Sequence, residues 1–438
     1  MKKSFRIVLF LLIPFCSKAQ DSLLTLEQAV GTALQNNYNI LLVKNDAKSL
    51  SIDRSYIYAG FLPRLNGTAT KIWNTNAQKQ ELSNGVKRDT SGIKSNNLQA
   101  SLNMNWTIFD GLRMFIVRDR LIELDKLGEL NVRNQVVTTI SEVIVNYYSI
   151  VRSKLQLKAI DEQISINEER VKLADRKYSV GLGAKPELLQ AKVDLNAQKS
   201  SRLRQVTLIQ QLKEQLNQRM AVATNAKYEV SDSIPINTNL QYGDLQTGIV
   251  TSNPSLKIAQ KNIEIANILI KERKSELFPT LSFNSAYNFS QLRNKAVINT
   301  FTPLFNQNRG FNFGFGLTVP ILNNFTTRRA IEQAKLQLDF QKLSYQNQLS
   351  HVDLQLSNAF KQYELQKLTL ALEEENISLA RENVTIALER FRQGVSTYLE
   401  LREAQISLEQ ALDRLIAARF NTKLAETDLL RIKGDLYQ

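Results

Sequence analysis

The chain has 438 residues, with 56 Lys and Arg against 42 Asp and Glu, one His and one Cys. A single Cys and a single His exclude zinc sites built from several Cys and His ligands, and they exclude a disulfide framework. The apolar fraction of 43% is ordinary and argues against a disordered chain or a membrane protein made of many apolar helices, and the composition as a whole argues against an enzyme.

Residues 1–19 have the pattern of a secretory signal peptide. A basic start precedes an apolar run at 7–15, and a small-x-small cleavage site ends at Ala19. The apolar run is too short for a helix that spans a bilayer. We therefore expect export from the cytoplasm and removal of residues 1–19. The alternative is a lipoprotein signal with Cys16 as the lipidated residue.

The excess of basic residues does not predict a nucleic-acid partner. Removal of residues 1–19 leaves 52 basic residues against 42 acidic ones, an excess that can indicate nucleic-acid binding. Here, however, Lys and Arg are interleaved with Glu and Asp along the chain, and export separates the protein from cytoplasmic nucleic acid. We therefore expect no nucleic-acid partner.

Two stretches alternate between apolar and small polar residues, which predicts β-strands with one apolar and one polar face. They cover residues 98–108 and 311–319, and each follows a partner with looser alternation, at 65–73 or 281–289. The polar linkers that we expect to be exposed loops are residues 74–97 and 291–310.

The two faces of these strands favour a membrane sheet. The polar face consists of nearly uncharged Asn, Ser, Thr and Gly, and the apolar face is rich in aromatic residues. This combination fits a lipid-facing barrel with a wet lumen. Soluble hairpins packed on a helix are the alternative. The candidate membrane-interface aromatics are Trp106, which could equally be a core residue, and Phe311, Phe313 and Phe315.

Long helices occupy most of the remaining chain. Four windows lack both Gly and Pro, and apolar residues recur in them every three or four positions, which is helical periodicity in elements of coiled-coil length. Elements of this length suit a stalk or a tube better than a compact globule. The windows are residues 129–180, 187–234, 325–393 and 395–433.

The chain also contains an internal repeat. The segment FLPRL at 61–65 matches LFPTL at 277–281, and YSVG at 178–181 matches FRQG at 391–394. Each repeat reads as a short helix, a β-hairpin and a long helix pair with a turn at its tip. The predicted parts are the first repeat at 20–235, with a hairpin at about 61–110 and a tip at 178–188, and the second repeat at 236–438, with a hairpin at about 279–322 and a tip at 391–400.

Four strands are too few to close a membrane barrel, since the smallest single-chain barrels have about eight. An open sheet edge in hydrocarbon leaves backbone groups unpaired at a cost of several kcal/mol each. Identical copies should therefore complete the wall by rotational symmetry. Two copies leave little room inside, whereas three give twelve strands and a water-filled lumen, so we expect a trimer.

These residues resemble the TolC-type outer-membrane efflux family, also called outer membrane factors. The resemblance extends over essentially the whole mature chain. It depends on two tip motifs in register, RKYSVGLGAKPELLQA and RFRQGVSTYLELREAQ, on the entry segment LTLEQAVGTALQNN, on the two strand starts and on the exit WTIFDGLR.

The resemblance implies a mainly α fold with a small β part. Long antiparallel helical hairpins and two β-hairpins per protomer would form a trimeric α-barrel across the periplasm and a twelve-stranded β-barrel in the outer membrane of a Gram-negative bacterium. It also implies outer-membrane lipid as surroundings, and docking to a periplasmic adaptor (a membrane fusion protein) and an inner-membrane pump of the RND, ABC or MFS type.

The tips carry the candidate docking residues. Glycine permits left-handed backbone values, so Gly181 and Gly394 are expected to reverse the long helices. A plain helical turn is one interpretation, and exposure to an adaptor is the other. The motif match adds Gly183, Tyr178 and Phe391 to this docking tip.

Glu400 and Glu403 are spaced i, i+3 and therefore share a helix face. By the motif match they occupy the family's periplasmic gate, where carboxylates from three chains would converge and attract cations. Glu187 is their counterpart in the first repeat. A solvated surface pair is the alternative. Ser396 replaces an arginine that locks the closed tip in some members, which leaves the closed-state contacts open.

The sequence thus predicts a passive exit duct of a tripartite efflux or type I secretion system, without catalysis, cofactor or metal. No phosphate loop, metal cluster or nucleophile with its base is recognisable. The alternative is a secreted coiled-coil scaffold or adhesin without a pore. The cargo and the pump class remain open.

Overall fold

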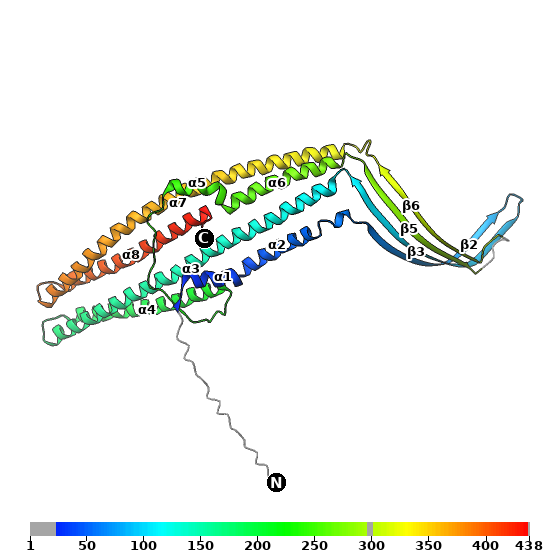
Figure 1. Cartoon of the computed structure of the whole chain (residues 1–438). Helices are drawn as coiled ribbons and strands as arrows, with labels where there is room; N and C mark the ends of the chain where they lie inside the picture. The colour runs from blue at the N-terminus through cyan, green and yellow to red at the C-terminus, as the bar shows by residue number, and fades with distance from the viewer. Residues whose placement is uncertain (1–22, 296–300, 437–438) are drawn as a thin grey trace, which may run out of the picture. The chain divides into compact units, whose positions relative to one another are not determined.

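The computed structural model describes residues 23–295 and 301–436. The described chain is mainly helical with a smaller sheet part, which confirms the predicted fold class at this level (Figure 1). The predicted signal peptide, with Cys16, lies outside the described residues. In the part of the chain that the structure describes, no helix combines the length and apolar character needed to cross a membrane.

The long helices come in pairs of equal length. α3 and α7 each have 67 residues, and α4 and α8 each have 36. The predicted division into two sequence repeats would give such pairs. The bounds are α1 Leu26–Asn36, α2 Tyr38–Ser55, α3 Arg113–Ser179, α4 Lys185–Met220, α5 Tyr242–Ser252, α6 Pro254–Ser275, α7 Thr326–Arg392 and α8 Tyr398–Lys433, with a short 3₁₀ helix at Ala59–Phe61.

Four antiparallel strands form one sheet in the order β2-β3-β5-β6. Their bounds are β2 Arg64–Glu81, β3 Lys87–Asp110, β5 Thr280–Asn294 and β6 Phe305–Thr318. A separate two-stranded parallel ladder joins β1 (Leu23–Leu24) to β4 (Glu229–Val230). Of the four strands, β2 and β6 are the edges, and each has a protein neighbour on one side only.

The expectation of exposed loops at 74–97 and 291–310 is wrong. β2 continues to Glu81 and β3 begins at Lys87, so the first linker is mostly paired strand, and β5 and β6 occupy much of the second. Ladder hydrogen bonds join backbone groups, so polar residues without apolar alternation can pair as well as alternating ones. The polar composition indicated exposure but not the absence of strand.

One helical window is also too long. The window 187–234 continues past the observed end of α4 at Met220, where Ala221 adopts a left-handed conformation (φ 51°) and its N–H bonds to the carbonyl of Asn217. A left-handed residue closes a helix whether or not it is glycine, although alanine adopts this conformation at some cost. The absence of Gly and Pro therefore did not reveal this end.

The strand register separates the sheet into two faces. Phe283 lies opposite Phe315, and Tyr287 opposite Phe311, so aromatic rings cover one face. The other face carries a ladder of polar side chains. Its hydrogen bonds join Thr68 to Ser101 (2.8 Å), Asn103 to Ser101 (2.7 Å) and Asn105 to Asn284 (2.6 Å).

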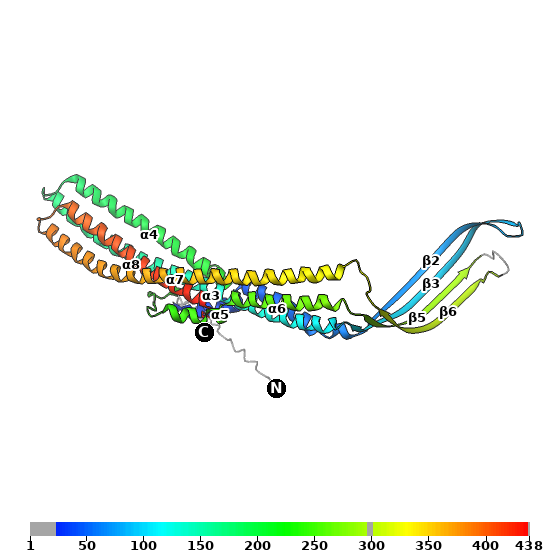
Figure 2. The ribbon, with the colours of Figure 1, turned by 90° about the horizontal axis from the view of Figure 1, so that it is seen from above.

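The chain divides into two compact units, which we describe separately. One contains the described residues of 1–43, 133–254 and 350–438, and the other contains those of 44–132 and 255–349. The second unit carries the four-stranded sheet. The first carries two antiparallel helix pairs, α3 with α4 and α7 with α8 (Figures 1 and 2).

Polar contacts across each helix pair accompany the apolar core of the first unit. Arg202 of α4 pairs with Asp161 of α3 at 2.7 Å, and Arg414 of α8 pairs with Glu373 of α7 at 3.2 Å. The fully buried Tyr363 donates its hydroxyl to the carbonyl of Asn237 at 2.8 Å. The two ion pairs hold together the helices of each pair, and the Tyr363 contact joins α7 to the segment that precedes α5.

Candidate functional site

The two helix reversals have matching backbone geometry. Gly181 and Gly394 both have φ of 76°, in the left-handed region where a side chain is strained. A Cβ added at either position would meet nothing within 4 Å, so conformation rather than space requires glycine. The helices thus reverse at the two positions that the sequence indicated.

The remaining predicted tip residues have different surroundings. Tyr178 is partly exposed, whereas Phe391 is only 3% exposed and lies under the ammonium of Lys177, which is 3.7 Å from the ring centroid. Lys177 also donates to the carbonyl of Phe391 at 3.1 Å. At Gly183 a Cβ would lie 2.9 Å from the Cβ of Lys177. Phe391 and Gly183 therefore shape the tip from within.

Each tip exposes large apolar side chains. In the first tip Leu182 is 82% exposed and Val180 is also exposed, and in the second Val395 and Leu399 are exposed. Sequence reasoning did not single these residues out, because it followed the motif letters that recur between repeats. Large apolar side chains at a helix reversal are the signal that could have identified them.

Glu400 and Glu403 line one groove between α7 and α8, a cavity of about 430 Å³ that Arg390 also lines. The Ser396 hydroxyl donates to Glu400 Oε2 at 2.8 Å, so this serine contacts a predicted gate carboxylate. The structure brings this pair of glutamates together on the second helix pair.

Glu187 and Glu400 occupy equivalent local positions. Each lies in the first turn of its helix, α4 or α8. Thr397 caps α8 by accepting from the backbone N–H of Glu400 at 3.2 Å. A carboxylate in a first turn is stabilised by the helix dipole, which contributes typically about 0.3–1 kcal/mol. This local role accounts for the recurrence of an acid in both repeats and is compatible with a gate role.

A buried charge network behind the tips was missed by the sequence analysis. Arg170 of α3, whose side chain is 2% exposed, pairs with Asp194 of α4 at 2.8 Å. From α8, Arg402 Nε donates to the same carboxylate at 3.2 Å, and the Tyr398 hydroxyl lies 3.3 Å from it. Gln405 of α8 accepts from Arg170 at 2.8 Å. The network therefore joins three helices through Asp194.

The charges around Asp194 determine its ionisation. Partial burial opposes the ionised form, but the hydrogen bond from Gln190 and the charges of Arg170 and Arg402 outweigh it and hold the pKa of Asp194 below its ordinary value. Burial also raises the pKa of the neighbouring Tyr398. Asp194 therefore acts as an anion between two guanidinium groups, and Tyr398 contributes a neutral hydroxyl.

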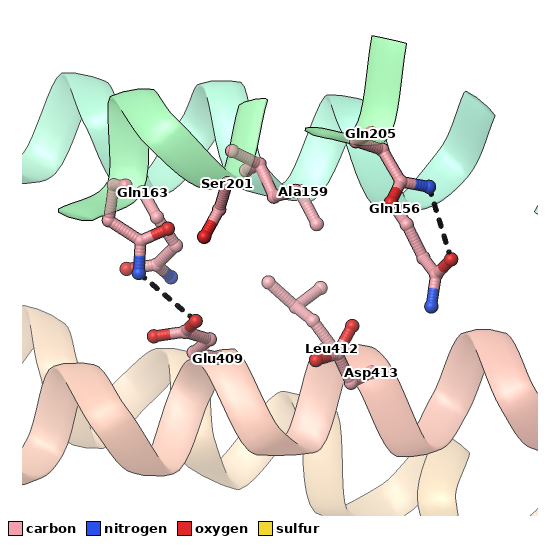
Figure 3. A pocket seen from close by; sticks show the side chains of 10 residues that line it. Gln156, Ala159, Gln163, Ser201, Gln205, Glu409, Leu412 and Asp413 are labelled. Atoms are coloured by element: carbon pink, nitrogen blue, oxygen red, sulfur yellow. Dashed lines mark hydrogen bonds between the residues drawn. The ribbon is translucent and has the colours of Figure 1, made fainter. Parts of the chain in front are cut away.

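The seam between the α3/α4 pair and α8 continues from this network as a cavity of about 190 Å³ (Figure 3). Its lining is mostly polar, and Gln198 donates to Glu409 at 3.0 Å while Gln205 donates to Gln156 at 3.3 Å. Burial raises the pKa of Asp413, against a smaller opposing effect of Arg152. Among the described residues, no group of three His, Cys, Asp or Glu side chains could hold a metal.

The predicted interface aromatics are placed along the sheet. One face of β6 carries an aromatic residue at every second position, and each is more than 60% exposed: Phe311, Phe313 and Phe315. Trp106 lies opposite Phe283 in the register and donates its indole N–H to the carbonyl of Phe61 at 2.8 Å. Trp106 is thus anchored where β3 approaches its end at Asp110.

Comparison with protein-family models gives a single description for most of the chain. The model described as "Outer membrane efflux protein" matches residues 21–222 and 249–435. Among curated proteins, the outer membrane efflux protein BepC of Brucella suis is 22% identical over 344 residues, which are 76% of this chain and 71% of BepC. The probable efflux pump outer membrane protein TtgC of Pseudomonas putida is 19% identical over 419 residues, 93% of this chain and 82% of TtgC.

Solved structures share the fold. The outer-membrane channel OprN superposes with a TM-score of 0.76 at 17% identity, covering 94% of this chain and 90% of that chain. The CmeC outer membrane channel of Campylobacter jejuni gives a TM-score of 0.75 at 18% identity, covering 94% and 86%. At these identities the likeness is one of fold.

Proposed function

The chain belongs to the outer membrane efflux protein family, and from this membership we propose that it is the passive exit duct of a tripartite efflux or type I secretion system. Proteins of this family are transport channels of the outer membrane and not enzymes, which confirms the expectation that the chain carries no catalytic site. In the proposed mechanism the duct has no turnover chemistry, and a partner pump supplies the energy.

The proposed duct is a homotrimer with a twelve-stranded barrel. The sheet of one chain has two edges, β2 and β6, which would expose unpaired backbone groups in hydrocarbon. Pairing β2 of one copy with β6 of the next removes every edge, and three copies supply twelve strands. The long helices of the three copies would form the α-barrel that continues the duct.

The two faces of the sheet support this arrangement. Aromatic side chains, including Phe313 and Phe315, would face lipid, while the hydrogen-bonded Asn, Ser and Thr ladder would line the lumen. Trp106 would lie near the periplasmic interface. A lumen of uncharged amides and hydroxyls is unselective, so the pump would determine which cargo enters.

The helix tips are the proposed adaptor-docking surface. Gly181 and Gly394 reverse the helices, Tyr178 is accessible, and Gly183 and the buried Phe391 hold the turns in shape. A periplasmic adaptor would contact the exposed apolar side chains of these turns, and an inner-membrane pump of the RND, ABC or MFS type would assemble behind it. Apolar exposure at both tips supports a protein partner there.

The proposed periplasmic gate consists of Glu400, Glu403 and Glu187. In a trimer the first two would place six carboxylates around the narrow end, where they would repel one another and bind cations. Arg390, which lines the same groove, is positioned to offset part of that repulsion within each chain.

Export and organisation complete the proposal. The N-terminal signal would direct the chain to the outer membrane of a Gram-negative bacterium, with residues 1–19 removed, and the two sequence repeats at 20–235 and 236–438 would be the building units. Lipidation at Cys16 is the alternative processing.

The observation that carries the proposal is a four-stranded sheet with two unpaired edges and an exposed aromatic face. Cysteine pairs on the edge strands test it, such as Thr68→Cys on β2 with Asn312→Cys on β6, along with neighbouring registers. In isolated outer membranes, oxidation should give a ladder of dimers and trimers. The matched control, Ser101→Cys with Asn288→Cys, joins residues paired within one chain and should give none. Material that is stable in water without detergent and gives no ladder in any register would refute the duct and favour a scaffold.

A further inference from the structure

Three cations interrupt the aromatic face of the sheet. Arg309 lies opposite Phe289, Lys71 opposite Leu98, and Arg293 opposite Phe305. The strand register places these pairs in three successive rows on the same face, because directly opposed residues project to one side. The face therefore changes from aromatic to cationic along its length.

Each cation is supported by an aromatic ring. The guanidinium of Arg309 lies 5.6 Å from the ring centroid of Phe289, and that of Arg293 lies 5.4 Å from the ring of Phe305. The ammonium of Lys71 lies 5.0 Å from the ring of Trp73. Contacts of this kind hold a cation near an apolar surface without neutralising it.

The two guanidinium groups are also oriented by amides on the same strands. With its amide oxygen toward the neighbouring arginine, Gln307 accepts from Arg309 Nε and Nη2, both at 2.8 Å. Gln291 accepts in the same way from Arg293, at 3.0 and 3.1 Å. These contacts leave part of each donor fork available for a further acceptor.

In the described part of the sheet, no carboxylate pairs with these three charges. The residues in the three rows include Ala69, Ala100, Asn96 and the pairs already given, and none is acidic. Among the described residues, no ion pair involves Lys71, Arg293 or Arg309, and all three are exposed. A lipid-facing surface normally excludes uncompensated charge except near the headgroups.

Their distance from the helical end of the sheet matches headgroup depth. Apolar or aromatic residues recur along β6 and the residue that follows it, from Val319 to Phe311, which is about 27 Å of extended chain at roughly 3.4 Å per residue. With a strand tilt of about 40° this corresponds to about 21 Å of membrane depth, close to the apolar band of about 25 Å in known barrels. Arg309 is the next residue of this face, and Lys71 and Arg293 lie beyond it.

We propose that Arg309, Lys71 and Arg293 form a binding surface for the phosphate groups of anionic lipid headgroups in the outer leaflet. The inference rests on the proposed function, since it needs the aromatic face to lie in lipid. Guanidinium groups match phosphate oxygens through paired donors, and an ammonium adds a point charge. A phosphate between the rows would supply the counter-charge that the sheet itself does not provide.

The two tryptophans of the chain allow a site-specific test. Trp73 contacts Lys71, and Trp106→Phe leaves it as the sole tryptophan. The purified full-length protein in detergent would be titrated with dansyl-labelled phosphatidylglycerol or phosphatidylcholine, and energy transfer from Trp73 would report binding. We expect a preference for phosphatidylglycerol that falls about fivefold for each cation replaced by Gln, and about a hundredfold in the triple variant.

Controls separate charge from folding. Replacing Lys71 by Arg and both arginines by Lys should retain the preference, since the charges remain. Removing three exposed helical cations, as Lys44→Gln, Lys48→Gln and Arg133→Gln, should also leave it unchanged.

Three outcomes would overturn the inference or its premise. An equal lipid preference in the wild type and the triple Gln variant, with trimers intact, overturns the lipid site and leaves the duct standing. Displacement of labelled phosphatidylglycerol by equimolar inorganic phosphate overturns the assignment to a lipid. A wild-type protein that needs no detergent overturns the proposed function itself.

Discussion

Removal of the Asp194 carboxylate should loosen the helices behind the tips. Asp194→Ala leaves Arg170, whose side chain is 2% exposed, with Gln405 as its remaining acceptor. Breaking a buried ion pair costs about 3–5 kcal/mol because a charge stays buried without its partner. The Asp194 side chain is 18% exposed, so we expect the loss of stabilising free energy to lie at the lower end of this range, about 3 kcal/mol. The half-exposed Arg402 adds less than about 1 kcal/mol.

Amide hydrogen exchange measures this loss locally. About 3 kcal/mol less opening free energy should lower protection of the adjoining turns of α3, α4 and α8 about a hundredfold. The matched control is Asp161→Ala, which removes the exposed partner of Arg202 on the same helix pair and should change protection by less than about fivefold. Equal protection in Asp194→Ala and the wild type would refute the view that this network holds the three helices together.

Tyr148→Phe should reduce the fall in melting temperature between pH 10 and 12. Burial raises the pKa of Tyr148 to about 12, so the folded state keeps the phenol neutral, and the stabilisation present below the ordinary pKa of about 10 is lost as the pH rises toward 12. Gly394→Ala should reduce export while trimers persist, because alanine is strained at φ 76°, whereas Gly243→Ala in α5 should be silent. Glu400→Gln with Glu403→Gln should weaken block of single-channel current by divalent cations.

Each of these predictions has a contrary result. A Tyr148→Phe melting curve that follows the wild type between pH 10 and 12 would remove this phenol from the alkaline transition. Full export with Gly394→Ala would show that the turn tolerates a side chain. Exposed Glu375 and Glu382 of α7 give a control of equal charge, and block that changes as much in their double Gln variant would make the gate effect non-specific.

The helix ends in the second half of the chain were predictable. The windows 325–393 and 395–433 correspond closely to α7 at Thr326–Arg392 and α8 at Tyr398–Lys433. Here the left-handed residue between the helices is Gly394, so a glycine in the sequence marks the position where the helix ends. At α4 the left-handed residue is Ala221, which composition cannot distinguish from a helical alanine. The parts of the strands that lie within 74–97 and 291–310 were not predicted, because a strand with two polar faces shows no alternation of apolar and polar residues in its sequence.

The candidate site was predictable only in part. The turn glycines and the carboxylates of α8 lie within continuous motifs, so spacing alone placed them together. The Asp194 network joins residues of three helices, with Arg170 and Arg402 more than two hundred positions apart. Nothing in the local sequence around any one of them distinguishes it from a solvated surface charge. Only packing of the helices brings the charges into contact.

The polar seam between α8 and the α3/α4 pair has a consequence for motion. Polar side chains such as Gln198 and Glu409 can replace their mutual hydrogen bond by hydrogen bonds to water at little net cost. Apolar side chains that separate gain no such replacement. Separating these helices would therefore expose polar groups at little cost, and the penalty would fall on the buried guanidinium of Arg170 and on the apolar cluster that Ala191 forms with Tyr398 and Leu401. The helices can therefore slide or part most easily along the stretch lined by amides, while the ion pair of Arg170 and the apolar cluster beside it resist the movement.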